Sequence, residues 1–74
     1  MSSQDEEVRY YQSKFRKWIQ SDKWECISEK LSDTYIDIIK QVMNANKDGD
    51  CSWILWNQCD NVLDRIRKIA KQIN

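Results

Sequence analysis

The sequence predicts a small all-α protein that folds as a single domain over residues 1–74. The chain contains no proline and one glycine, and 32% of its residues are charged. Its apolar residues recur at intervals of three and four, the spacing of one face of a helix. The main cluster of turn-forming residues lies at 44–51. We therefore expect a three-helix arrangement, in which an N-terminal amphipathic helix packs across an antiparallel helical hairpin.

The first helix is predicted over about residues 4–20. Ser3 and Glu6 have the spacing of a capping box, and acidic residues at positions 5–7 suit the positive end of a helix. Four apolar residues then follow at helical spacing: Val8, Tyr11, Phe15 and Trp18. This stripe breaks at residues 20–23, where the first helix should end.

The second helix is predicted over about residues 23–43, with Asp22 and Glu25 as its capping box. Two apolar rows follow the helical repeat. The first row is Trp24, Ile27, Leu31, Tyr35, Ile38 and Val42, and the second is Ile36, Ile39 and Met43. Residues 32–34 (Ser-Asp-Thr) favour caps and turns, so two helices separated by a short break are the alternative to one continuous helix.

The third helix is predicted over about residues 52–73, with Ser52 as its N-cap. Its apolar seam alternates steps of four and three: Leu55, Cys59, Val62, Ile66, Ile69 and Ile73. Trp56, Leu63 and Ala70 broaden this stripe, as expected for a helix that faces two neighbours. Asp64 and Lys68 have the spacing of a helical ion pair.

The composition argues against membrane-spanning and exported proteins and against a strongly charged binding partner. Twelve basic residues balance twelve acidic ones, so no overall field draws the chain toward nucleic acid or an anionic membrane. The chain has no run of 18 apolar residues, and its N-terminus is acidic and polar. We expect a cytoplasmic protein that neither spans a membrane nor is exported. A chain of this length buries only about 60–65% of its unfolded surface, so a protein partner or self-association is expected.

The chain has few residues suited to catalysis or metal binding. The three cysteines (Cys26, Cys51 and Cys59) form no CxxC pair, and the chain has no histidine to act as a base or to complete a zinc site. Cys59 lies on the apolar seam and is interpreted as a core residue. We expect reduced thiols, no cofactor and no enzymatic activity.

The turn at residues 44–52 resembles an EF-hand calcium loop in part. Oxygen-bearing side chains occupy alternate positions, with glycine at the sixth. These weak candidates for metal binding are Asn44, Asn46, Asp48, Asp50 and Ser52. Position twelve, which should supply a bidentate glutamate, is Leu55. We interpret the segment as a helix-to-helix turn, with a degenerate cation-binding module as a less favoured alternative.

The chain is rich in aromatic residues, and a bundle of this size cannot bury all of them. Tryptophan and tyrosine are favoured anchors of protein interfaces. The interface candidates are Trp53, Trp56, Tyr10, Trp18 and Trp24. The alternative is that these rings cover the ends of the core.

Two basic clusters raise the possibility of a nucleic-acid surface. Their members are Lys14, Arg16, Lys17, Arg65, Arg67, Lys68 and Lys71. A helix-turn-helix protein would need a turn of three or four residues, whereas the predicted loop has about eight. We interpret these residues mainly as solvated helix faces.

The segment FRKWIQSDKWECISEKL, which begins at Phe15, is followed by a polar-punctuated helix, a turn at residues 44–51 and a helix carrying Gln58, Val62 and Ile66. This pattern, over about residues 15–70, resembles short helical-hairpin proteins common in bacteriophage genomes, in which a tryptophan, here Trp24, opens the first hairpin helix. Cys59 stands where those proteins often have glycine. The resemblance implies a helical fold and a phage origin, and it implies no particular activity.

The leading hypothesis is a non-enzymatic protein-interaction module, either a host-protein modulator or an assembly component. A nucleic-acid-binding accessory protein is the alternative from another class, for which salt-dependent binding would be required.

Overall fold

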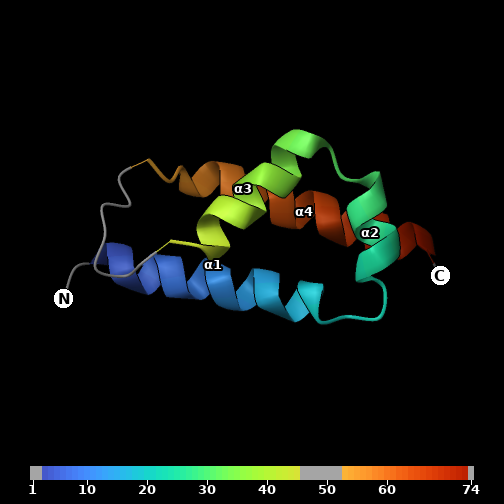
Figure 1. Ribbon diagram of the computed structural model, residues 1–74, viewed down its shortest axis with the longest axis horizontal. Helices are drawn as coiled ribbons and strands as arrows, with labels where there is room; N and C mark the ends of the chain where they lie inside the picture. Colours follow the sequence, from blue (N-terminus) through green and yellow to red (C-terminus); the bar gives the residue numbers. More distant parts are fainter. Residues whose placement is uncertain (1–2, 46–52, 74) are drawn as a thin grey trace.

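The computed structural model describes residues 3–45 and 53–73, with side chains from residue 6 onward. These residues form four helices, α1 (Ser3–Ile19), α2 (Trp24–Lys30), α3 (Asp33–Met43) and α4 (Trp56–Ile73). The prediction of a small all-α fold is confirmed. In Figure 1, α1 and α4 run in the same general direction, from the end of the molecule near the N-terminus toward the C-terminus, and α3 runs back in the opposite sense.

The last helix, α4, is the centre of the core and contacts each of the other three helices. Its buried residues are Cys59, Val62, Leu63, Ile66, Ile69 and Ala70, which confirms most of the predicted seam and its broadening. Leu55, the first member of that seam, precedes the helix and is 53% exposed. The predicted start at residue 52 is therefore wrong by four residues, and Ser52 itself lies outside the described residues.

The first helix packs against both α3 and α4. Val8, Tyr11 and Phe15 are buried as the stripe predicted, and Trp18 is half-buried. The side-chain amide of Gln12 donates to the carbonyl oxygens of Val42 and Ala45, each over 3.0 Å. The Val42 carbonyl, in the last turn of α3, also accepts from the Ala45 N–H over 3.2 Å, and Ala45 itself follows the helix.

The second predicted helix is two helices, so the expectation of one continuous helix over 23–43 is wrong and the alternative break is correct. Leu31 and Ser32 have extended backbones, with ψ angles of 145° and 155°. The Ser32 side chain accepts a hydrogen bond from the backbone N–H of Tyr35 over 3.3 Å and caps α3. Leu31 stays buried at the break, with 7% of its surface exposed. The apolar repeat is therefore not interrupted there and does not indicate the break.

The turn before α2 also differs from the prediction. Lys23, and not Asp22, occupies the N-cap position, and it makes no side-chain capping bond. The turn is closed instead by Ser21, whose hydroxyl oxygen accepts from the Lys23 N–H over 3.2 Å and whose carbonyl accepts from the Trp24 N–H over 3.0 Å. This turn fixes the end of α1 beside the start of α2.

Candidate functional site

The five aromatic interface candidates are spread over the molecule and do not form one patch. Tyr10 and Trp53 are the most exposed, at 53% and 46%. Trp18, Trp24 and Trp56 are half-buried against the core. Trp56 stacks on Tyr11, Trp18 lines one pocket and Trp24 lines another.

Trp56 belongs to an internal aromatic cluster that joins α1 to α4. Its ring stacks on that of Tyr11, with 5.3 Å between centroids and 8° between planes. The rings of Tyr10 and Tyr11 make a T-shaped pair with 5.0 Å between their centroids, and the ammonium of Lys14 lies 5.3 Å from the centre of the Tyr10 ring. Because Trp56 is already stacked, it is a weaker interface candidate than Trp53.

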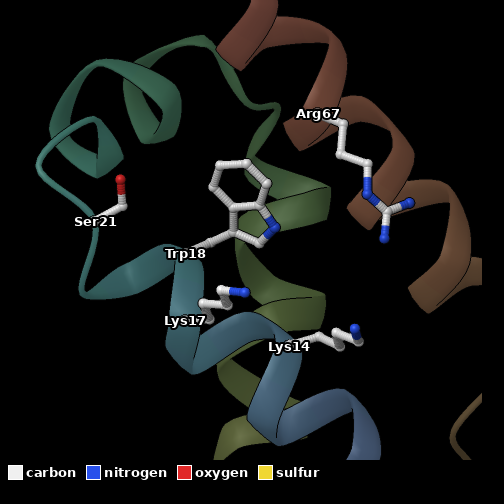
Figure 2. Close-up of a pocket in the computed structure, with 5 residues that line it drawn as sticks. All are labelled: Lys14, Lys17, Trp18, Ser21 and Arg67. Atoms are coloured by element: carbon white, nitrogen blue, oxygen red, sulfur yellow. The ribbon is translucent and has the colours of Figure 1, made fainter.

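Trp18 lies in a pocket that we call the basic pocket, with a volume of about 310 Å³. Its lining residues are Lys14, Lys17, Trp18, Ser21 and Arg67. Figure 2 shows the Trp18 indole between Ser21 on one side and Arg67 of α4 on the other, with Lys14 and Lys17 beside it. The pocket brings together members of both predicted basic clusters, which are separated by about fifty positions in the chain.

The other basic candidates do not line this pocket. Arg16, Arg65, Lys68 and Lys71 are exposed on α1 and α4. Lys68 makes the predicted ion pair with Asp64 over 3.2 Å, and both side chains are more than 60% exposed. Such a solvated pair contributes little to stability. For these four residues, the interpretation as solvated helix faces agrees with their exposure.

Trp24 lines a second pocket, the apolar groove, which has a volume of about 330 Å³. Its lining residues come from the end of α1, from α2 and from α3: Ile19, Trp24, Ser28, Ile36, Ile39, Lys40, Met43 and Asn44. Of these residues, only Trp24 is among the interface candidates predicted from the sequence. The second apolar row of α3, Ile36, Ile39 and Met43, was the signal that this helix has more apolar surface than one neighbour can cover.

A third pocket of about 230 Å³ lies between α3, the segment before α4 and the first turn of α4. Ile38, Trp53 and Leu55 contribute apolar surface to it. Ile54, which the helical repeat did not identify, is buried at 6% exposure between its two exposed neighbours. This alternation arises because residues 54–55 are not helical, so Leu55 points out of the seam predicted for it.

Of the candidate cation ligands in the partial EF-hand pattern, Asn44 alone lies within the described residues. Asn44 ends α3 with right-handed helical backbone angles (φ −92°, ψ −2°), while Asn46, Asp48, Asp50 and Ser52 lie outside the described residues. Within residues 3–45 and 53–73, no group of three or more Cys, Asp or Glu side chains could hold a metal ion.

The two described cysteines differ in environment. Cys59 is buried at 1% exposure, as predicted for a seam residue, and burial raises its pKa to about 11. A thiol with a raised pKa is a poor nucleophile at neutral pH. Cys26 is exposed on α2, and Cys51 lies outside the described residues.

Comparisons with known proteins found no match. No protein-family model matches the chain, and neither a curated protein nor a solved structure matches it. Among the described helices, none has the length and apolar character needed to cross a membrane.

Proposed function

We propose that this protein is a non-enzymatic module that binds another protein through the apolar groove. The observation that carries the proposal is the incomplete cover over Ile19, Trp24, Ile36 and Met43. Ile19 is 36% exposed and the other three are half-buried, while Ile39 in the same lining is buried. Surface of this kind stays in contact with water until a partner covers it.

The shape and chemistry of the groove favour an amphipathic helix as its occupant. Helix-in-groove recognition places a few apolar side chains, spaced three or four residues apart, in a hydrophobic channel. Trp24 and Met43 suit this role because a large ring and a flexible thioether adapt to an inserted side chain. Lys40 is the only charged residue in the lining, so we expect an acidic residue beside the apolar anchors of the partner helix.

The resemblance to phage hairpin proteins supports a narrower proposal, in which the partner is a host protein in the cytoplasm. An assembly component is the other form of the same proposal, and in that case the groove would receive a second copy of the chain. The two forms differ in stoichiometry. A modulator is expected to be monomeric until its partner is added, whereas an assembly component forms a homo-oligomer of fixed size.

The first experiment is the absolute mass in solution, measured by size-exclusion chromatography with light scattering at several loading concentrations. The second is capture of partners from a bacterial lysate with the wild-type chain, Ile19→Gln and Leu55→Gln. Both variants replace one exposed aliphatic side chain with an amide of similar size, but only Ile19 lines the groove.

We expect Ile19→Gln to weaken capture of one specific protein by about tenfold, since removing one buried apolar contact in an interface costs roughly 1–2 kcal/mol. Leu55→Gln should leave capture unchanged. Equal loss in both variants, or capture that neither variant alters, would contradict binding at the groove. A homo-oligomer that only Ile19→Gln dissociates would replace the host partner with a second copy.

A further inference from the structure

We infer that the basic pocket binds a nucleotide, with its phosphate held by Lys17 and Arg67 and its base stacked on Trp18. The inference is independent of the proposed protein-binding function, because the basic pocket and the apolar groove share no lining residue. It depends on three features of the pocket: its charge, its aromatic wall and its hydroxyl group.

The charge of the pocket is one-sided. Three of its five lining residues are cationic and none is acidic. Among the described residues, the one ion pair joins Lys68 to Asp64, so the cations of the basic pocket have no carboxylate partner there. Lys14 also lies over the Tyr10 ring, which leaves Lys17 and Arg67 as the less engaged cations. Like charges that line one pocket from two helices repel one another, and a bound anion offsets that repulsion.

Arg67 suits a phosphate better than a single carboxylate. Its guanidinium presents a planar fork of donors that matches two phosphate oxygens at once, and Lys17 adds a compact charge from the facing helix. The chain has equal numbers of basic and acidic residues. Attraction therefore comes from the local arrangement in the pocket and not from the field of the whole protein.

The indole of Trp18 provides the second feature. It is half-buried against the core, yet it also forms part of the pocket wall, at the centre of the view in Figure 2. A flat ring next to cations is the arrangement with which proteins bind single nucleotides of a strand, because every base can stack on it. An acidic peptide would use the cations and would gain less from the ring.

Ser21 provides the third feature. Its oxygen already accepts a hydrogen bond from the Lys23 N–H, which holds the side chain in place at the edge of the pocket. The hydroxyl hydrogen remains available as a donor to the base or the sugar, because Figure 2 places Ser21 on the opposite side of the indole from Arg67. The pocket volume of about 310 Å³ lies at the lower end of the range for small-molecule sites. This size fits one nucleotide better than a large cofactor.

The test is a titration followed by two-dimensional ¹H–¹⁵N NMR of the full chain. The four tryptophans give four indole N–H signals, so the Trp18 signal can be followed separately once it is assigned through Trp18→Phe. The probes are thymidine monophosphate, inorganic phosphate and a ten-residue oligothymidylate. The variants are Arg67→Gln and Arg65→Gln, which remove the same charge from the same helix, inside and outside the pocket.

We expect thymidine monophosphate to shift the Trp18 signal, and to bind more tightly than inorganic phosphate because only the former has a base to stack. Arg67→Gln should weaken this binding by about tenfold, as loss of a charge-assisted hydrogen bond does, and Arg65→Gln by less than about twofold. The oligothymidylate identifies the source of the ligand. Tighter, strongly salt-dependent binding of the strand indicates single-stranded nucleic acid, and no gain over the monophosphate indicates a free nucleotide.

Three results would overturn the inference: no shift of the Trp18 signal with any probe at millimolar concentration, equal binding of inorganic phosphate and thymidine monophosphate, or equal losses in Arg65→Gln and Arg67→Gln. A poly-glutamate peptide that binds the pocket more tightly than the nucleotide would assign it to an acidic protein segment instead. None of these results depends on whether Ile19→Gln affects partner capture.

Discussion

The hydroxyl of Tyr11 donates a hydrogen bond to Oδ1 of Asp60, with 2.6 Å between the two oxygens, and so joins α1 to α4 across 49 positions of sequence. The ring of Tyr11 is buried at 7% exposure and stacks on Trp56. Burial, followed by the hydrogen bond to Asp60, raises the pKa of Tyr11 above its ordinary value of 10.0. One side chain therefore contributes both apolar contact and a specific polar link between the two longest helices.

Replacing Tyr11 with phenylalanine should lower the free energy of unfolding by about 1 kcal/mol, because the stacked ring stays while the hydrogen bond is lost. Urea denaturation followed by circular dichroism measures this change. Tyr10→Phe is the matched control: Tyr10 is exposed, and its variant should differ from wild type by less than about 0.5 kcal/mol. Equal effects of the two variants would show that the bond to Asp60 contributes nothing to stability.

Gln12→Ala should destabilise the fold by about 1 kcal/mol, because the amide's two hydrogen bonds are lost. The Val42 carbonyl keeps its bond from the Ala45 N–H, and the Ala45 carbonyl, just after α3, would have to be hydrated. Thermal unfolding and hydrogen exchange of α3 test this prediction. The control is Gln72→Ala, which removes an exposed glutamine near the end of α4. A change confined to global stability, with the last turn of α3 no more exchangeable than before, would contradict the assigned role.

Ser32→Ala should cost about 1 kcal/mol through loss of the N-cap of α3. Ser32→Asp should restore most of this stability, since aspartate is an equally good N-cap and lies at the positive end of the helix dipole. Urea denaturation of both variants measures the difference, with Ser13→Ala in α1 as the exposed control. Stability in Ser32→Ala equal to that of wild type would mean that the break does not depend on the cap.

Stability should fall as the pH rises from 9 to 11. Burial raises the pKa of Cys59 from 9.0 to about 11, so the unfolded state loses its thiol proton at a lower pH than the folded state does. The stabilising contribution is complete below pH 9 and is lost as the pH rises through 11. Cys59→Ala should flatten this part of the curve, at the cost of a small cavity.

Urea denaturation between pH 7 and 11 provides the measurement, and Cys26→Ala is the control because Cys26 is exposed. Tyr11 acts in the same direction at higher pH, so Tyr11→Phe should change the curve mainly above pH 10. A pH profile of Cys59→Ala that matches wild type between pH 9 and 10 would exclude the thiol as the cause.

Most of the helical structure and of the core could be predicted from residue spacing. The seam from Cys59 to Ile69 and the stripe of Val8, Tyr11 and Phe15 are buried as expected, because one apolar face at a period of 3.6 residues has few other ways to leave water. The break at Leu31 and Ser32 could not be chosen from this pattern. Leu31 fits the buried apolar row whether residues 23–43 form one helix or two, and it is buried in the structure. The N-cap bond of Ser32 is the feature that marks the start of a separate helix.

Helical structure and the positions of the apolar faces follow from the sequence, since these properties depend on neighbours within a few positions. The stacking of Trp56, the groove shared by Ile19 and Met43, and the pocket lined by Lys17 and Arg67 depend on how the helices pack. The physical reason is that spacing along a helix fixes which residues share a face, whereas the residues that two faces bring together depend on how the helices cross.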